Sequence, residues 1–479
     1  MFDLVVIGGG PAGATAALRG RELGAHVALV ERGRFGGTCT NDGCVPTRVL
    51  AKAARLVRDA EQFADYALAG TPPEVDFLGL LRRTQAIVDK VHAKKQLREH
   101  LDRAGITVVE GEARFVDEHT VAVSDGAEIQ AAKFVICAGG HARRLPFPGG
   151  ELALTHSDVW SMRALPRSVA IVGAAATGCQ LASIFAAFGT QVTLLEMLPR
   201  VLPTEDELVS DVVGDALRES GIEITLGIQG VDRIERADGG LRLHYKQQDE
   251  PRNVEAEAVI VAVGWPGNVD ALNLPAANVR AERSYIVVDD FLRTSVPHIF
   301  AAGDITGRMM LVQSASHEAR VAAENALGQT PSAFTHTIVP HGGFTDPEYG
   351  SVGLPEAAAR KTHDCAVAVV PYADLDRAVV DGRDVGFCKL VVDRTGGEIL
   401  GAHVVGEQAV EVVQLVAAAM VAGSRVEQLA QLELAYPTFT AIVGLAARQL
   451  VREMGIVPVV PEWRGIVGTR PVEWERSER

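Results

Sequence analysis

One pattern occurs twice in this chain and limits its possible folds more than any other feature. In the first copy, an apolar run leads into GGGPAG and a stretch of small residues, and a second apolar run ends at Glu31. The second copy begins SVAIVGAAATG and ends in the same way at Glu196. In both copies the acidic residue lies 23 positions after the first glycine, Gly8 or Gly173. This repeat predicts two β-α-β units.

The glycines of the first copy indicate a dinucleotide-binding turn. Gly8, Gly10 and Gly13 occupy all three positions of G-x-G-x-x-G, which provide a tight turn, close approach of a pyrophosphate and close helix packing. Glu31 is placed to accept a hydrogen bond from a ribose hydroxyl. The alternative is a tight strand-to-helix turn without a ligand, but the complete motif between a predicted strand and a predicted helix favours cofactor binding.

The second copy has Gly173 and Gly178 but carries Ala175 at the middle position. One methyl group leaves slightly less room for a pyrophosphate, and we still expect a nucleotide there. Glu196 favours NADH over NADPH, because a carboxylate pairs with a ribose 2′-hydroxyl and repels a 2′-phosphate. Arg200 is a nearby cation that would weaken this preference, unless it is simply a surface charge.

An apolar segment that ends in glycine follows each unit, FVICAGG with Gly139 and AVIVAVG with Gly264. These segments predict strands that return beneath each cofactor. HIFAAGD, which ends at Asp304, predicts a return to the first domain. The expected fold class is α/β, with two dinucleotide-binding domains followed by an α+β domain. The predicted domains are 1–150 together with 281–330, 151–280, and 335–479.

Charge and composition exclude several other classes of protein. The chain has 46 Lys and Arg against 61 Asp and Glu, a net charge of −15 without a basic run, so we expect no nucleic-acid partner. The first apolar run stops after four residues and lacks a basic segment before it, which predicts a cytoplasmic protein without a membrane span. Six cysteines in 479 residues are too few for a secreted disulfide framework.

Cys39 and Cys44 form the one close cysteine pair, in GGTCTNDGCVPTR. A predicted helix begins beside them, and a helix N-terminus lowers the pKa of a thiol. A metal site would need further Cys or His ligands, for which the segment 31–91 offers no pattern. We therefore expect a redox disulfide, with inert thiols as the alternative. The remaining cysteines are single residues in apolar runs and are expected in the core: Cys137, Cys179, Cys365 and Cys388.

The order and spacing of these motifs resemble the class I pyridine nucleotide-disulfide oxidoreductases. The resemblance rests on GGGPAG, GGTCTNDGCVPT, the second nucleotide unit, HIFAAGD, FTDPEYGSVG and GAHVVG, and it covers residues 1 to about 455. The family includes dihydrolipoamide dehydrogenase, glutathione reductase and mercuric reductase. It implies a Rossmann-like FAD domain, a Rossmann-like NAD(P) domain and a C-terminal dimerisation domain, and therefore a homodimer.

The resemblance also implies roles for individual residues. Glu31 would hold the FAD ribose and Asp304 the ribityl chain. Cys44 would lie against the flavin as the charge-transfer thiolate, and Cys39 would be the interchange thiol. Electrons would pass from NADH to FAD, then to the cysteine pair and finally to a small oxidised substrate, for which we expect a low-molecular-weight disulfide.

Two positions beside the flavin depart from the family pattern together. Most members have Lys where this chain has Arg48, and Glu where it has Gln180. The family's Lys and Glu form an ion pair next to flavin N5. Replacing both keeps a cation and removes its carboxylate, so we expect Arg48 and Gln180 to contact the flavin edge with altered electrostatics. Neutral drift is the alternative.

A further departure lies near the C-terminus. Disulfide reductases of the family carry H-P-T-x-S-E, whose His, oriented by Glu, is the general acid and base across the dimer interface. Here Tyr436 and Ala441 replace them. A phenol with a pKa of about 10 is a poor base at neutral pH. Either Tyr436 donates a weak hydrogen bond, or the substrate needs little protonation, as would a disulfide with a stable leaving thiolate, a metal ion or a quinone.

Several alternatives remain at this point. Mercuric reductases also lack the His, but they end in a vicinal cysteine pair, and this chain has no cysteine after Cys388. Lipoamide oxidation is disfavoured because it needs a base. A non-catalytic flavoprotein is a third possibility. We expect structural or surface roles for His317, His336 and His341, and surface packing for the tail after Gly455.

Overall fold

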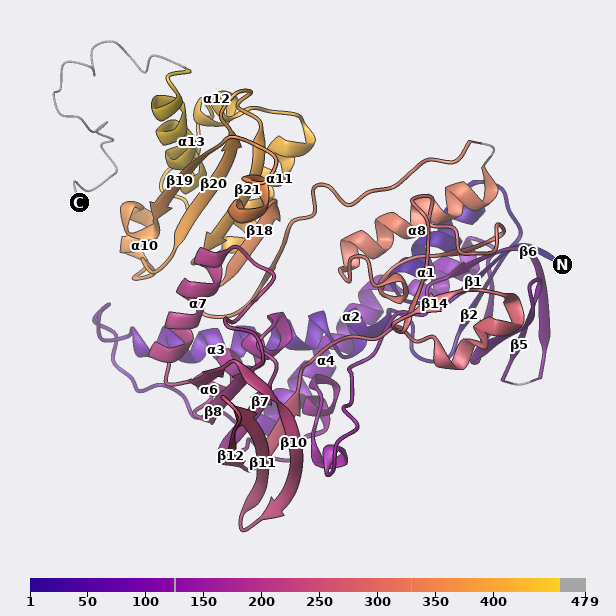
Figure 1. The fold of residues 1–479 in the computed structure, drawn as a ribbon, viewed down its shortest axis with the longest axis horizontal. Helices are drawn as coiled ribbons and strands as arrows, with labels where there is room; N and C mark the ends of the chain where they lie inside the picture. Colours follow the sequence, from indigo (N-terminus) through magenta and orange to yellow (C-terminus); the bar gives the residue numbers. More distant parts are fainter. Residues whose placement is uncertain (125, 329, 457–479) are drawn as a thin grey trace.

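The computed structural model describes residues 1–456 except 125 and 329. The expectation for the C-terminal tail falls mainly on 457–479, which lie outside the described residues. Figure 1 shows three groups of elements, with the N-terminal sheet at one end, a second sheet below and the C-terminal sheet at the other end.

The first sheet contains the first predicted β-α-β unit. Its strand order is β3-β2-β1-β6-β5-β4, with β16 paired to β6. The chain runs from β1 (Phe2–Ile7) through α1 (Pro11–Glu22) to β2 (Val27–Glu31), and β1 and β2 are parallel. The strands are apolar and buried, which places them in the middle of the sheet. The remaining strands are β3 (Thr107–Glu110), β4 (Ala113–Asp117), β5 (Thr120–Val123), β6 (Glu128–Ile136) and β16 (Ile299–Ala301).

The sheet explains why the segment near Asp304 belongs with the N-terminus. Strand β16 pairs in parallel with β6, so residues far along the chain return to the first sheet. Helix α8 (Val312–Leu327) then packs beside α1 on the same face (Figure 1). The domain boundaries expected from the sequence stay a prediction.

Helices between β2 and β3 connect the first unit to the rest of the molecule. They are α2 (Gly37–Asn41), α3 (Cys44–Glu61), α4 (Phe77–Lys95) and α5 (Leu97–Arg103). Helix α3 packs against α4 and against α6 of the second unit. Cys39 lies in α2 and Cys44 begins α3, the helix that joins the two β-α-β units. Figure 1 shows α3 between these units.

The second predicted unit forms a parallel sheet of order β13-β7-β8-β9. It consists of β7 (Ser168–Val172), α6 (Ala176–Ala187), β8 (Gln191–Glu196), α7 (Glu207–Glu219), β9 (Glu223–Leu226) and β13 (Ala258–Val261). An antiparallel sheet of β10 (Ile228–Ala237), β11 (Gly240–Gln247) and β12 (Glu250–Ala256) is inserted before β13. The small hairpin β14 (Ala281–Glu282) and β15 (Tyr285–Ile286) follows.

An extended segment without helix or strand, about 330–340, leads to the C-terminal sheet (Figure 1). That sheet is antiparallel, in the order β17-β18-β21-β20-β19. Its strands are β17 (His341–Gly343), β18 (Tyr349–Gly353), β19 (Cys365–Pro371), β20 (Phe387–Asp393) and β21 (Ile399–Val405). The helices around it are α9 (Glu356–Ala359), α10 (Asp376–Val380), α11 (Ala409–Val421), α12 (Val426–Ala430) and α13 (Ala441–Met454). Apolar residues from β20, β21, α11 and α13 share one buried core.

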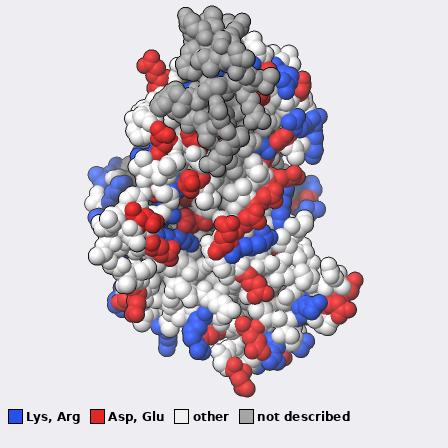
Figure 2. All heavy atoms as spheres, turned by 90° about the vertical axis from the view of Figure 1, so that its left-hand side faces the viewer, with Lys and Arg blue, Asp and Glu red and all other residues white. Residues whose placement is uncertain are grey.

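The surface carries charges of both signs. On the face drawn in Figure 2, acidic side chains gather in a band across the middle, with basic side chains around them. Across the described residues, we find no helix that is both long and apolar enough to cross a membrane. The cysteines expected in the core are buried: Cys137, Cys179, Cys365 and Cys388.

Candidate active site

The glycine turns of the two units have the same geometry. Gly8 has φ +108° and Gly173 has φ +101°, conformations that favour glycine. A Cβ on Gly13 would lie 1.7 Å from the carbonyl oxygen of Gly8, and one on Gly178 would lie 1.8 Å from that of Gly173. Each helix can therefore approach its strand only because the third glycine lacks a side chain.

The acidic residues of the two units also make equivalent contacts. Glu31 accepts hydrogen bonds from the backbone N–H of Gly9 and from that of Gly33, the latter at 2.7 Å. Glu196 accepts from the N–H of Ala174 at 2.6 Å and of Leu198 at 2.9 Å. In both units the carboxylate therefore holds the glycine turn against the end of the second strand.

A cavity of about 1380 Å³ extends along the first unit to the second unit and to β17. Predicted site residues that line it are Gly8, Gly10, Glu31, Cys39, Cys44, Gly139, Ala175, Gln180, Gly264 and Asp304. Those outside its lining, among the residues described, are Gly13, Arg48, Gly173, Gly178, Glu196 and Tyr436. The cavity therefore brings together the first nucleotide turn, the cysteine pair and the start of α6.

The cavity fits an extended dinucleotide at its first turn. Gly10 lines it, and a Cβ on Gly10 would have Gly37 as its nearest neighbour at 3.6 Å, so the backbone there is open to a ligand. Glu31 lies at the same turn and Asp304 lies further along. This donor and acceptor set suits the pyrophosphate and hydroxyl groups of FAD.

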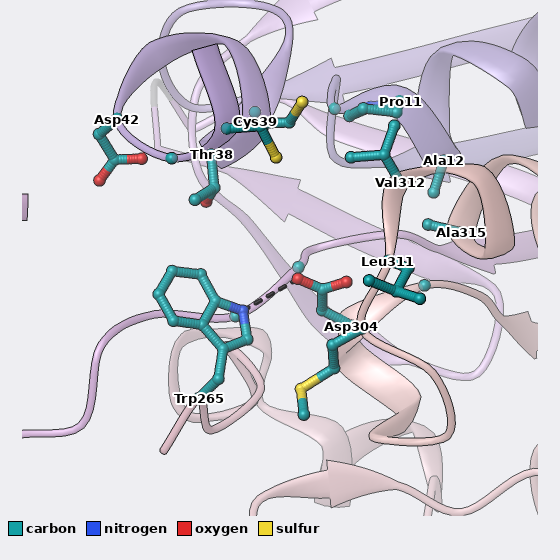
Figure 3. Close-up of a pocket in the computed structure, with 18 of the residues that line it drawn as sticks. Pro11, Ala12, Thr38, Cys39, Asp42, Trp265, Asp304, Leu311, Val312 and Ala315 are labelled. Atoms are coloured by element: carbon teal, nitrogen blue, oxygen red, sulfur yellow. Dashed lines mark hydrogen bonds between the residues drawn. The ribbon is translucent and has the colours of Figure 1, made fainter. Parts of the chain in front are cut away.

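Cys39, which faces the cavity in Figure 3, lies in α2, and Cys44 is the first residue of α3. The hydrogen bond from Cys39 lowers the pKa of Cys44 to about 7, although burial opposes the shift. The same hydrogen bond, together with burial, raises the pKa of Cys39. In the dithiol form, the proton is therefore held by Cys39 and the negative charge by Cys44. The described residues contain no group of three or more His, Cys, Asp or Glu side chains arranged for a metal ion.

Side chains around α2 hold the cysteines in place. The amide of Asn41 donates to the carbonyl of Gly37 at 3.0 Å and its oxygen contacts His92 Nε2 at 2.8 Å, which ties α2 to α4. Lys95, on the same helix, donates to Thr40 Oγ1 at 3.1 Å. The charge of Lys95 also lowers the pKa of both cysteines, as a smaller contribution. The sequence reasoning missed Lys95, because α4 lies far from the cysteine motif along the chain.

Asp304 faces the cavity beside a tryptophan that the sequence reasoning also missed. Trp265 Nε1 donates to Asp304 Oδ2 at 2.9 Å (Figure 3). Burial raises the pKa of Asp304. The ring of His156 lies 5.3 Å from that of Trp265, and burial lowers the pKa of His156. Trp265 directly follows the predicted cofactor glycine Gly264, which is a signal that could have identified it.

Arg48 and Gln180 both contact Phe344. The Arg48 guanidinium lies 3.9 Å from the Phe344 ring centroid, and its Nη1 is 3.5 Å from Glu348. Gln180 accepts a hydrogen bond from the Phe344 N–H at 3.1 Å and lines the cavity. The two side chains therefore share one neighbour, and contact of Arg48 with the flavin stays a prediction.

Tyr436 lies away from the cysteines of its own chain. The residue is 55% exposed and its hydroxyl donates to Asp376 Oδ2. Ala441 begins α13. Within one chain, position 436 therefore lies outside the lining of the cavity that holds the cysteine pair.

The histidines considered as substitutes occupy different environments. His317 is exposed and its ring lies 4.9 Å from that of Phe334. His336 contacts the buried Glu318 at 2.6 Å. His341 lines the cavity and pairs with Glu205, a residue without any sequence motif to mark it.

Comparisons with known proteins agree with this arrangement. The family described as pyridine nucleotide-disulphide oxidoreductase matches residues 2–319, and its dimerisation domain matches 339–447. Dihydrolipoyl dehydrogenase 2 of Haloarcula marismortui is 34% identical, over 93% of this chain and 96% of its own. Mercuric reductase of Lysinibacillus sphaericus is 32% identical, over 93% of this chain and 82% of its own.

Solved structures show the same similarity. The HOCl-induced flavoprotein disulfide reductase RclA from Escherichia coli has a TM-score of 0.84 and 27% identity, covering 93% of this chain and 99% of that one. Sequence and fold therefore agree over nearly the whole length of both proteins.

Proposed function

Because this chain belongs to the class I pyridine nucleotide-disulfide oxidoreductase family, we propose that it uses NADH to reduce a low-molecular-weight disulfide. It is an FAD-containing oxidoreductase of this class, with a dimerisation domain.

The proposal rests on the cysteine pair. Cys44 has its pKa lowered to about 7 and accepts a hydrogen bond from Cys39. As Cys39 sulfur attacks one sulfur of the substrate disulfide, its proton passes to Cys44, the substrate S–S bond breaks and one thiolate leaves. Cys44, with its pKa of about 7, then gives that proton to solvent, and its thiolate attacks Cys39 of the mixed disulfide and releases the second thiolate. The substrate gains two electrons and the cysteine pair becomes a disulfide.

FAD, when bound, supplies the transfer of an electron pair from nicotinamide to the cysteines. We propose that the Gly8 turn holds its pyrophosphate, Glu31 its ribose and Asp304 its ribityl chain. The contacts of Glu31 with Gly9 and Gly33 support this assignment, because they orient the carboxylate at the turn. Asp304 is supported by its place in the cavity wall.

NADH is the proposed electron donor. Both oxygens of Glu196 are held by backbone N–H groups at the second turn, where a ribose 2′-hydroxyl would pair with the carboxylate. Arg200 contacts Glu207 at 3.3 Å and donates to the Pro203 carbonyl at 3.2 Å. Arg200, the cation that could have favoured NADPH, is therefore already paired within its own chain.

Tyr436 restricts which disulfides this enzyme can reduce. We propose that Tyr436 of a second copy donates only a weak hydrogen bond at the cysteines, since a phenol with a pKa of about 10 transfers protons poorly near neutral pH. The substrate should therefore release a thiolate or thione that is stable without a proton. The same reasoning disfavours lipoamide.

A substrate panel tests the proposal. NADH oxidation is measured with lipoamide, glutathione disulfide, other biological disulfides, mercuric ion and quinones. We expect the highest kcat/KM for a disulfide with an acidic leaving thiol, and its loss in Cys39→Ser. Equal activity of Cys39→Ser toward that disulfide would contradict the proposal.

Reduction of metal ions or quinones is the second candidate. It is favoured by the similarity to a mercuric reductase and to an RclA structure solved as a Cu(II) complex. Turnover of quinone or metal ion that survives in Cys39→Ser, with no disulfide turned over by the unsubstituted enzyme, would support this candidate instead.

A further inference from the structure

Glu205 and His341 form an ion pair in the wall of the cavity. His341 Nε2 lies 3.1 Å from Glu205 Oε1, and the second oxygen of Glu205 accepts from Ser351 Oγ at 2.7 Å. Glu205 is 8% exposed, whereas His341 is 33% exposed and lines the cavity. His341 and Ser351 are also cross-strand partners on β17 and β18. The carboxylate is therefore enclosed, and the imidazole connects it to the open space.

The geometry favours a positively charged imidazole. His341 Nε2 faces the Glu205 carboxylate, and its Nδ1 faces the carbonyl oxygen of Val339 at 3.2 Å. Both neighbours only accept hydrogen bonds, so both ring nitrogens are best satisfied when each carries a proton. Burial lowers the pKa of His341, but the hydrogen bond and charge of Glu205 outweigh it and leave that pKa raised.

The pair lies at the end of the cavity formed by the second nucleotide unit. Strand β17 packs against α6, and Gln180 on α6 binds the backbone of Phe344 just after β17. Gln313 in the first turn of α8 donates to the Pro340 carbonyl at 2.8 Å. Residues of this turn line the cavity near Cys39 (Figure 3). His341 therefore lies between the NADH unit and the helix that borders the cysteines.

Other cations near the cavity are engaged elsewhere. Arg32 pairs with Glu112 at 3.2 Å and Arg34 with Asp89 at 2.8 Å, both beside the first nucleotide turn. Arg48 lies over Phe344, outside the lining of the cavity. Among the described residues that line the α6 end of the cavity, His341 is the group that can carry a positive charge.

We propose that His341, held as an imidazolium by Glu205, stabilises the negative charge that bound flavin gains when NADH delivers its hydride. With both cofactors bound, hydride transfer would convert NADH to NAD⁺ and add two electrons and one proton to the flavin, which would leave one negative charge for His341 to offset. His341 gives up no proton in this step. Glu205 is a positioning residue, because it acts through His341. The inference concerns electron entry and is independent of the disulfide substrate.

Several other groups face the pair and bear on its titration. Ser351 on β18 joins Glu205 to His403 on β21, at 3.1 Å between Ser351 Oγ and His403 Nδ1. The adjacent Asp206 is bound by Lys389 on β20 at 2.9 Å. From α6, the facing group is the neutral Gln180. Glu205 is the carboxylate in direct contact with His341.

The test uses FAD-loaded enzyme carrying Cys39→Ser and Cys44→Ser, so that flavin is the electron acceptor that NADH reduces. The flavin midpoint potential is measured by anaerobic dye titration, and the rate of flavin reduction by NADH is measured by rapid mixing. In His341→Gln we expect a more negative flavin potential and flavin reduction that is about tenfold slower. Loss of one unit charge near the flavin ring, at an effective dielectric of about 20, has an effect of about this size. His341→Lys restores the charge and should restore both values. His317→Gln, an exposed histidine outside the cavity lining, is the matched control.

Glu205→Gln adds a readout that a purely structural role would not produce. Without the carboxylate, burial lowers the pKa of His341, so the imidazole loses its proton at a lower pH. Glu205→Gln should match its parent in acidic buffer and, as pH rises, should approach His341→Gln at a lower pH than that at which the parent loses its charge. A parental potential and rate in His341→Gln would overturn the proposal, as would equal impairment of His341→Lys and His341→Gln. Failure of the disulfide panel would leave these results unchanged, so the two proposals are tested separately.

Discussion

Cys44 shows how a local contact changes the chemistry of a single residue. Its place at the first position of α3 and its hydrogen bond from Cys39 favour the thiolate, while burial favours the thiol. The contacts outweigh burial and move the pKa from the usual 9.0 to about 7. For Cys39, the same hydrogen bond and burial act in one direction and raise the pKa. Two neighbouring thiols therefore differ in charge at neutral pH.

This difference predicts the pH dependence of alkylation in the reduced enzyme. The thiolate of Cys44 is present above its lowered pKa and is lost as pH falls, so its reaction with iodoacetamide should be half-maximal at about pH 7 rather than at 9.0. Peptide mass spectrometry after timed quenching separates Cys44 from Cys39. In Cys39→Ala the hydrogen bond is gone and the midpoint should move upward. An unchanged midpoint in Cys39→Ala would show that Cys39 is not the cause.

At the level of elements, the repeated unit depends on the contact between the third glycine and the first. Gly13 touches Gly8 and Gly178 touches Gly173 in equivalent positions. The middle position is less demanding, because Ala175 occupies it in the second unit as the N-cap of α6. The motif therefore tolerates a methyl group at its middle position, which a ligand would approach. It does not tolerate one at its third position, where the helix packs against the strand.

Gly178→Ala should consequently damage NADH binding. The added Cβ would lie 1.8 Å from the Gly173 carbonyl oxygen, which forces α6 away from β7. We expect a loss of about 1–3 kcal/mol in the free energy of unfolding and a higher KM for NADH, with FAD content retained. Thermal unfolding and steady-state kinetics measure the two effects. Ala175→Gly is the matched control and should stay close to wild type; equal KM values for NADH in the two variants would contradict the argument.

At the level of the whole molecule, the cysteine pair and position 436 lie in different parts of one chain. Cys39 and Cys44 line the cavity, whereas Tyr436 lies outside its lining and contacts Asp376. The dimerisation domain supports a homodimer. A second copy would then bring its own position 436 toward the cysteines, and each site would combine residues of two chains.

Mixed dimers test this combination. Restoring the missing dyad as Tyr436→His with Ala441→Glu should raise turnover of disulfides that leave as ordinary thiolates by about tenfold or more. When the dyad is on a chain that also carries Cys39→Ser, and the other chain is wild type, the gain should remain in the one working site. When the dyad and intact cysteines are on the same chain, and the other chain carries only Cys39→Ser, the gain should disappear. The opposite pattern would place the dyad and the cysteines in one subunit.

The sequence by itself determined the two nucleotide-binding units, the cysteine pair and the family. These features depend on residues that are close along the chain, because a strand, a glycine turn and a helix must follow one another at set spacings. Gly8 with Glu31 and Gly173 with Glu196 show this, since one spacing produced the same backbone contacts in both units.

The tertiary structure alone decided which distant side chains meet. Glu205 and His341 are 136 positions apart, and Arg48 stacks on a phenylalanine of the C-terminal part of the chain. His341, for which we expected a structural or surface role, pairs with Glu205 and lines the cavity. Such contacts arise from how one sheet packs against another, and the spacing of residues along a single sequence carries no record of that packing. The Glu205–His341 pair in the cavity wall is therefore a property of the folded chain.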